Sequence, residues 1–526
     1  MPGASIALPQ DIETLTSMLL TEIDRNAELE KKLTWAEEKY RAMELRYFGR
    51  KSEHFSPDED KQNRLFDEAE EHASESVPAV ILKVHIPAHD RVKRGRKPKV
   101  AVAETVEIVH DLSEDEKRCP CCGETRPSIG EERTSEYDLV PAHVVERVHI
   151  VKKYGQCACA AFKESGNPTI VAARGPAKII PGSDFTNRTT AFFMTAKYAD
   201  AIPFYRMEKM LARDGLIVSR AALCNQAVAV GRAIADLIDA MDRDIHQGPV
   251  ILMDETTVQV LKDERGPPGR KSYMWLSRGY RDRKPIHLFR YHATRSGEFA
   301  AKLLEGYQGY LQTDGYSGYN CVGESPGIVH VGCFAHIRRK FHEAWETAGK
   351  TGISSEALEI IRRLYTVESE CRSRLESGSI DGPSFVASRR SLVEPIIAEF
   401  HDWIERGARS VAPQSALGKA IAYAVGQLDR AAHFVDHELL TPDTNAAENA
   451  IRPFVVGRKN WLFSGSPLGA HASAGIYSLI ETAKANGHEP FKYLAYLFDQ
   501  LPLCHSKDDR ETLLPYRLAP SSYAEN

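Results

Sequence analysis

The sequence has no long hydrophobic run and few cysteines, and both absences narrow the class of protein. No stretch of about eighteen uncharged apolar residues occurs, so a membrane-spanning helix is not expected. The opening residues, MPGASIALPQDIETL, hold no basic segment that leads into an apolar one, so we expect no secretory signal and a cytoplasmic protein. Ten cysteines among 526 residues are too few for a disulfide-stapled scaffold.

What is present is a long, mixed composition with segregated charge. With 42% hydrophobic and 27% charged residues the chain is globular, and its length exceeds what one hydrophobic core serves, so we expect several domains. The net charge of −5 argues weakly against a nucleic-acid partner. However, Arg94, Arg96 and Lys97 lie in an extended basic stretch that could follow a DNA minor groove. A solvated basic linker, within residues 51–110, explains that stretch equally well.

A heptad pattern covers residues 12–43, and eight of its ten a and d positions are apolar. Asn26 occupies an a position, where a single polar residue can fix register and oligomeric state. Residues 1–50 are therefore predicted to form a coiled coil that joins two copies of the chain. The alternative is a helix that packs on its own protein.

Five of the ten cysteines cluster between residues 119 and 159. Cys119 and Cys122 have the spacing of a zinc knuckle, and Cys157 and Cys159 provide a second pair, so residues 111–175 are predicted to form a zinc-ribbon-like domain with structural Zn²⁺. The second pair departs from the usual spacing, and Cys121 could substitute as the fourth ligand. Between the pairs, residues 134–156 alternate as strands do.

The pattern turns helical over residues 176–245. Residues 205–213 form an amphipathic stretch, Asp214 and Gly215 break it, and Ser219 is a suitable N-cap for a second helix. This outline is that of a DNA-binding helix-turn-helix, although a plain helical hairpin has the same features.

Strand-like segments then carry two aspartates. A buried run, Val250–Met253, is predicted to end at Asp254, and a later strand ends at Asp314. The order of three strands, helix, strand, helix, strand and helix is that of a ribonuclease-H-like α/β layer, in which the first and fourth strands are neighbours. Two adjacent carboxylates repel each other unless a cation lies between them, and magnesium suits such a site.

Glu448 is the candidate for a third carboxylate. It has a structural alternative, because Asn445 as N-cap and Glu448 three residues later would form a capping box. Asp254 and Asp314 could likewise just end a strand and begin a turn. The strand order and the following basic residues, Arg452, Arg458 and Lys459, favour a metal triad.

Several strings together resemble the insertion-sequence-66 family of DDE transposases. They are Met253-Asp254-Glu255-Thr256, Thr313-Asp314-Gly315-Tyr316-Ser317-Gly318-Tyr319, residues 332–341 (GCFAHIRRKF), residues 445–448, residues 457–463 (GRKNWLF) and residues 478–487 (SLIETAKANG). The likeness covers nearly the whole chain.

The resemblance implies a transposase that binds double-stranded DNA at element ends, cuts it and joins the ends to target DNA. Asp254, Asp314 and Glu448 would bind two Mg²⁺ ions. Residues 246–343 and 440–490 would form the catalytic domain, residues 344–439 a helical insertion, and residues 491–526 a C-terminal helix and tail. Accessory transposition proteins are further expected partners. The phosphate-binding residues would be Arg338, Arg339, Lys340, Arg452, Arg458 and Lys459.

Two other functions fit parts of the sequence. A non-catalytic DNA-binding regulator could keep the coiled coil, ribbon and helix-turn-helix around a decayed nuclease fold. A nuclease or resolvase of the same fold would hydrolyse DNA without joining it. Strand joining separates these alternatives from a transposase.

Overall fold

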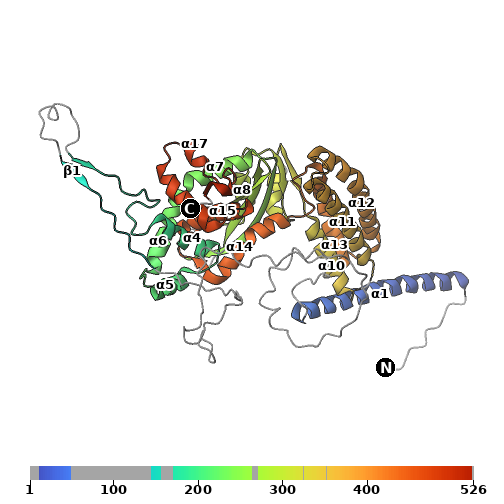
Figure 1. The fold of residues 1–526 in the computed structure, drawn as a ribbon. Coiled ribbons are helices and arrows are strands. Elements are labelled where there is room, and N and C mark those ends of the chain that lie inside the picture. The colour runs from blue at the N-terminus through green and yellow to red at the C-terminus, as the bar shows by residue number, and fades with distance from the viewer. Residues whose placement is uncertain are drawn as a thin grey trace, which may run out of the picture. The chain divides into compact units, whose positions relative to one another are not determined.

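The computed structural model describes residues 11–48, 144–155, 170–263, 271–323, 325–350 and 352–523, which form many helices and a mixed sheet (Figure 1). This confirms the predicted α/β class. Outside the described residues lie the predicted zinc ligands, the alternative ligand and the basic stretch: Cys119, Cys122, Cys157, Cys159, Cys121, Arg94, Arg96 and Lys97. Their roles stay predictions.

The N-terminal segment forms one long helix, α1 (Ile12–Phe48), where the heptad pattern predicts it. Seam residues on this helix are solvent-exposed: Leu19 is 63% exposed, Leu33 62% and Tyr40 69%. An apolar seam gains stability only when it is covered, which is the physical basis of the coiled-coil prediction.

The segment predicted to alternate as strands pairs only briefly. β1 (Lys153–Gly155) and β2 (Ile170–Ala172) form an antiparallel ribbon. Residues 144–152 carry no regular structure.

Four helices follow: α4 (Asn187–Tyr198), α5 (Phe204–Arg213), α6 (Arg220–Ala233) and α7 (Ala235–His246). The predicted break and cap between α5 and α6 are confirmed, because Gly215 adopts φ +89° and Ser219 Oγ accepts a hydrogen bond from the Ala222 amide at 3.2 Å. Among the described helices none alone is long and apolar enough to cross a membrane, although α6 and α7 together, bent by 51°, reach that length and apolarity.

The sheet has the strand order β5-β4-β3-β6-β7, and β8 also pairs with β3. The first three strands are antiparallel, whereas β6, β7 and β8 run parallel to β3 or to each other. The predicted neighbourhood of the first and fourth strands, β3 and β6, is confirmed. The strands are β3 (Val250–Val260), β4 (Lys271–Arg281), β5 (Lys284–His292), β6 (Gly309–Gln312), β7 (Ile328–Val331) and β8 (Phe463–Ser464).

The prediction that the first strand ends at Asp254 is wrong. β3 continues to Val260 because β4 pairs with it as far as Gln259. Pairing with β6, however, stops at Leu252, and β8 joins only at Gln259. Asp254 therefore lies where the parallel neighbour of β3 ends, at a gap in the sheet between β6 and β8.

Helices cover both faces of the sheet. Successive strand residues face opposite sides, and Phe289 of β5 packs on Phe454 and Tyr477, whereas Trp275 of β4 packs on Phe299. These partners lie on α14 (Asn445–Trp461), α15 (Pro467–Ala485) and α8 (Gly297–Leu303). The six-stranded sheet is therefore packed between helices, with α14 and α15 on one face and α8 on the other.

The segment between β7 and α14 is helical. It contains α10 (Phe334–Thr347), α11 (Ser354–Glu376), α12 (Gly382–Ser410) and α13 (Ala416–Ala432), followed by the short 3₁₀ helix η2 (His433–Asp436). The remaining short elements are η1 (Ser317–Tyr319), α9 (Asn320–Gly323), α16 (Pro490–Gln500), η3 (Leu501–Leu503), α17 (Lys507–Glu511) and η4 (Pro520–Tyr523).

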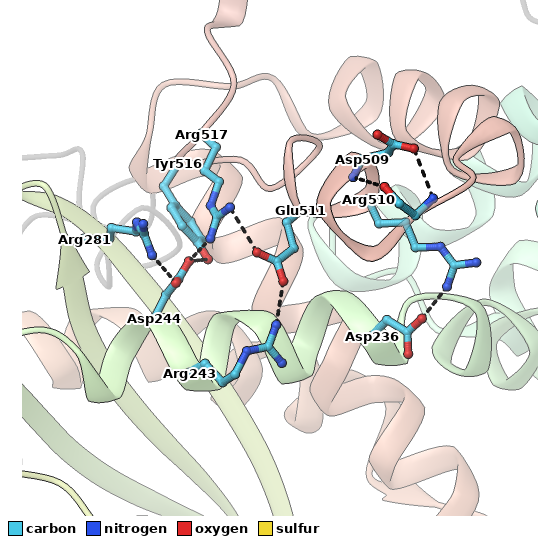
Figure 2. A network of polar contacts seen from close by, with 10 residues as sticks. Asp236, Arg243, Asp244, Arg281, Asp509, Arg510, Glu511, Tyr516 and Arg517 are labelled. Atoms are coloured by element: carbon cyan, nitrogen blue, oxygen red, sulfur yellow. Dashed lines mark hydrogen bonds and ion pairs between the residues drawn. The ribbon is translucent and has the colours of Figure 1, made fainter.

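An ion-pair network joins the C-terminal segment to α7 (Figure 2). The carboxylate of Asp244 accepts hydrogen bonds from Arg281, from Tyr516 at 2.6 Å and from Arg517 at 2.8 Å. Glu511 bridges Arg517 and Arg243. The network thus pairs the buried carboxylate of Asp244 with two arginines, Arg281 and Arg517.

Candidate active site

Asp254 and Asp314 come from adjacent strands at the same level of the sheet. In the parallel pair, Leu252 is opposite Gln312, so two residues further Asp254 and Asp314 reach the same level and the same face. The carboxylate of Asp314 accepts a hydrogen bond from the Tyr316 amide at 3.0 Å, which fixes the turn after β6. The predicted pairing of the two aspartates thus follows from the register.

Glu448 reaches the aspartates from the first turn of α14. The pKa of Asp254 is raised to about 7, first by burial, then by the charge of Glu255, and further by Glu448 and Asp314. Such an effect requires the acids to lie close to one another. The three carboxylates, up to 194 residues apart in the sequence since 448 minus 254 is 194, are therefore near enough for their charges to act on one another.

The capping-box interpretation of Glu448 is wrong. The residue that precedes α14 is Thr444, whose side chain makes no capping hydrogen bond, so Glu448 is the fourth residue of the helix and one position too late. The Asn445 amide instead donates to Asp443 Oδ1 at 3.1 Å. Glu448 has no capping role that would explain its presence.

His336 is a neighbour of the acids that sequence reasoning did not assign to the site. Its Nε2 lies 4.0 Å from Glu448 Oε1, and its buried Nδ1 has no hydrogen-bond partner among the described residues. Burial and then the charge of Arg339 lower its pKa, although Glu448 and Asp314 oppose this. Cys333, by contrast, is a buried structural cysteine, whose sulfur accepts hydrogen bonds from the amide and the hydroxyl of Thr444.

A second missed group surrounds Glu255, whose side chain is 1% exposed. Arg295 forms an ion pair with it and Tyr319 donates its hydroxyl to it. The Arg295 guanidinium also stacks 3.7 Å from the ring centre of Tyr316, the residue that bonds Asp314. Arg295 thus connects the residue after Asp254 with the turn after Asp314. No spacing in the sequence reveals this contact, because it depends on which face each strand residue takes.

The predicted phosphate-binding residues lie on two helices that begin at the acid cluster. Arg338, Arg339 and Lys340 follow His336 on α10, and Arg452, Arg458 and Lys459 follow Glu448 on α14. Arg339 and Lys459 are exposed. Lys340 pairs with Glu343 at 3.0 Å.

Arg458 has a structural contact that was not predicted. Its Nη1 donates to Thr256 Oγ1 at 3.0 Å, to Thr257 Oγ1 at 2.9 Å and to the Thr257 carbonyl. This nitrogen therefore fastens the C-terminal half of α14 to β3.

The donors at the site suit a hard cation. Asp254, Asp314 and Glu448 offer carboxylate oxygens, the ligands that Mg²⁺ prefers, and a cation would relieve the repulsion that contributes to the raised pKa of Asp254. Across the described ranges, however, no group of three His, Cys, Asp or Glu side chains is arranged so that it could hold a metal ion. The carboxylate oxygens are the kind of ligand that Mg²⁺ prefers. The three carboxylates would, however, have to move closer together to bind one ion.

Comparisons with known proteins identify the family of this chain. The chain is 29% identical over 447 residues to the uncharacterized protein y4qI of Sinorhizobium fredii, covering 83% of this chain and 80% of that protein. It is 27% identical over 424 residues to the uncharacterized protein y4jD of the same organism, covering 77% and 79%. The model of the IS66 C-terminal element matches residues 478–516, and the model of the Transposase IS66 family matches residues 182–472, more than half of the sequence. The chain therefore belongs to the IS66 family of transposases.

Proposed function

We propose that this transposase is a DDE enzyme that cleaves DNA at element ends and joins the freed ends to target DNA. Two observations support the proposal: the β3–β6 register brings Asp254 and Asp314 to the same level of the sheet, and the charges of Glu448 and Asp314 contribute to the raised pKa of Asp254. The strand order, with three antiparallel strands followed by two parallel ones beside the first, is that of a ribonuclease-H-like core. DNA is the substrate that membership of a transposase family implies.

In this mechanism Asp254, Asp314 and Glu448 would hold Mg²⁺, which would supply activation of the attacking oxygen and stabilisation of the leaving oxygen. Water attacks the phosphorus at the element end, the bond to the 3′ oxygen breaks, and a 3′-hydroxyl and a 5′-phosphate result. In the same site the 3′-hydroxyl then attacks the phosphorus of a target phosphodiester and loses its proton, the bond to the target's 3′ oxygen breaks, and that oxygen leaves as a 3′-hydroxyl while the element end becomes joined to the target 5′-phosphate. His336 Nε2, which lies 4.0 Å from Glu448 Oε1, would accept a proton during the reaction. Arg339 and Lys459, exposed on α10 and α14, would bind the DNA phosphates.

A strand-transfer assay tests the proposal. Full-length protein is incubated with element-end DNA, a supercoiled plasmid and Mg²⁺, and inserted product is measured. Asp254→Asn and Glu448→Gln should bind the ends normally but neither cleave nor join them. Glu343→Gln, which removes an exposed carboxylate from the nearby helix α10, is the matched control and should retain both steps.

The outcomes separate the alternative functions. Cleavage without inserted product would identify a nuclease or resolvase. Binding without metal-dependent cleavage in the unmodified protein would identify a non-catalytic regulator. Cleavage that survives in both acid variants would refute the assignment of the site.

We further propose that the parts outside the catalytic region recognise the DNA ends. The ribbon with Cys119, Cys122, Cys157 and Cys159 would bind structural Zn²⁺, while the basic stretch and the α5–α6 hairpin would contact DNA. Metal analysis of purified protein should find zinc, and Cys122→Ser should lower the zinc content. A protein with no zinc and unchanged DNA binding after that substitution would contradict the ribbon proposal.

The exposed seam of α1 supports the proposal of a homodimer. Leu29→Glu places a charge at a seam position and should convert the dimer into a monomer in sedimentation experiments. Ser17→Glu, at the position of the heptad opposite the seam, is the control and should leave the dimer intact. A monomeric unmodified protein would contradict the proposal.

A further inference from the structure

The helical segment between β7 and α14 contains a group of buried charges that the proposed chemistry does not use. Glu368 on α11 is 5% exposed, and Arg389 on α12 is fully buried. Both arginines pair with Oε1 of Glu368: Arg372, one turn later on α11, at 2.7 Å, and Arg389 at 3.4 Å. We call Glu368, Arg372 and Arg389 the arginine clasp. Removing charges from water is costly, so a clasp of this kind needs further partners.

Those partners are backbone carbonyls of one short segment, residues 437–440. Arg389 donates to the carbonyls of His437 at 2.6 Å and of Leu440 at 3.0 Å. Arg372 donates to the carbonyls of Glu438 at 2.7 Å and of Leu440 at 2.8 Å. Four charged hydrogen bonds therefore hold a stretch that has no helix or strand of its own.

From Leu440 the chain runs to Glu448 through further fixed points. The Thr441 carbonyl accepts a hydrogen bond from Gln312 at 2.6 Å, and the Pro442 carbonyl accepts one from the Phe334 amide at 2.7 Å. Burial raises the pKa of Asp443, and the side chain of Tyr365, which lies on α11 one turn before Glu368, acts against this rise. Helix α14 begins two residues later. Helix α11 thus holds this stretch both at the clasp and at Asp443.

We propose that the insertion is the positioning element for Glu448, with the arginine clasp and Tyr365 fixing where α14 begins relative to the two aspartates. The inference rests on the proposed function, because it assigns Glu448 to the metal site. It gives the insertion a role within the active site. Arg372, Arg389 and Tyr365 are positioning residues, since they act through the backbone that leads to Glu448.

The test measures Mn²⁺ binding to the full-length protein by paramagnetic resonance, counting only the binding that Asp254→Asn removes. Arg372→Met should raise the Mn²⁺ concentration for half-saturation by about tenfold, the usual size of a loss in the outer shell of a metal site. Tyr365→Phe removes a single hydroxyl and should raise it by about threefold. Because phenylalanine keeps the ring of Tyr365, we expect this second variant to fold. Its Mn²⁺ titration then tests the inference if Arg372→Met does not fold.

Asp244→Asn is the matched control, because it breaks a buried acid–arginine cluster that joins α7 to β4 and to the C-terminal segment (Figure 2). It should lower the melting temperature without changing the Mn²⁺ titration. The inference is overturned if Arg372→Met and Tyr365→Phe titrate like the unmodified protein, or if Asp244→Asn shifts the titration equally.

A separate readout distinguishes this inference from the proposed function. Amide hydrogen exchange over residues 441–448 should become faster in Arg372→Met and stay unchanged in Asp244→Asn. If the unmodified protein shows no Asp254-dependent Mn²⁺ binding, the proposed function fails, while the exchange result still shows whether the clasp fixes the start of α14. Unchanged exchange together with normal Mn²⁺ binding overturns the clasp alone.

Discussion

Two aspartates in this molecule, one buried and one half-buried, are surrounded in opposite ways. The buried Asp244 accepts hydrogen bonds from Arg281, Tyr516 and Arg517, and although burial alone would raise its pKa, these partners lower it overall (Figure 2). Asp254 is half-buried, and burial together with the charges of neighbouring acids raises its pKa to about 7.

The difference teaches how to distinguish a structural acid from a functional one. The fold supplies the counter-charge of Asp244 from its own side chains, so the network is complete within the chain. At Asp254 the charges that act on the pKa are those of other acids, Glu255, Glu448 and Asp314, whereas Arg295 is paired with Glu255. An acid cluster whose charge the fold does not balance is suited to bind a cation from solution.

The largest expected effect is on catalysis. Asp254→Asn should lower the single-turnover cleavage rate by about 10³-fold or more, because it removes a ligand of the ions that stabilise the transition state. Asp244→Asn, assayed well below its melting temperature, should retain cleavage. Equal losses in the two variants would erase the distinction between the two acids.

The next effect is on the pH dependence of folding. The folded pKa of Asp254 lies above its ordinary value of 3.8, so the stabilising protonated form is fully present below about pH 4 and is lost as pH rises through about 7. In metal-free protein this should lower the free energy of unfolding by about 4 kcal/mol across that range, at 1.36 kcal/mol per pKa unit. Denaturant titrations at several pH values measure it.

Two controls sharpen the pH experiment. Asp254→Asn should flatten the slope, and added Mg²⁺ should lower the apparent pKa. Asp244 should show the opposite sign, since its pKa is lowered and its contribution is lost only as pH falls below about 4. A slope that persists in Asp254→Asn would assign it to another group.

Asp244→Asn should reduce the free energy of unfolding by about 3 kcal/mol, because it leaves Arg281 and Arg517 without their common acid. Thermal and denaturant unfolding measure the loss. In Asp254→Asn, by contrast, metal-free protein should keep or gain stability at neutral pH. A comparable loss in both variants would show that Asp254 is structural.

The smallest effect concerns the pair inside the active site. Arg295→Met should lower the free energy of unfolding by about 2 kcal/mol, since it leaves the buried Glu255 without its charged partner. The double variant Arg295→Met/Glu255→Gln should recover much of that loss, which a double-mutant cycle measures. Additive losses would show that the two side chains are not coupled.

Much of this site could be predicted from local sequence. Asp254 and Asp314 each follow a short apolar run, and the order of the runs predicts that their strands are neighbours, as the β3–β6 register confirms. The turn at Gly215 and the cap at Ser219 are likewise local signals. These features depend on residues within a few positions of one another.

Features that depend on long-range register could not be predicted. The Glu255–Arg295–Tyr319 group arises because β3 extends beyond Asp254 and turns Glu255 to the opposite face. The capping interpretation failed by one residue, because α14 begins after Thr444. Tyr365 meets Asp443 across 78 residues, since 443 minus 365 is 78. No short pattern in the sequence encodes such contacts.

Helix α14 is attached to the sheet near its C-terminal end, and Glu448 lies near its other end, so a tilt of the helix would move Glu448. Near the C-terminal end of α14, Arg458 forms a hydrogen bond with Thr256 of β3. After the helix the chain turns at Leu462, which has φ +66°, and β8 then pairs with β3. Glu448 lies ten residues before Arg458, since 458 minus 448 is 10, or about 15 Å along the axis. A tilt of about 4° would swing the carboxylate by about 1 Å, enough to change a rate by about a hundredfold. A small tilt of α14 would therefore displace Glu448 relative to the two aspartates.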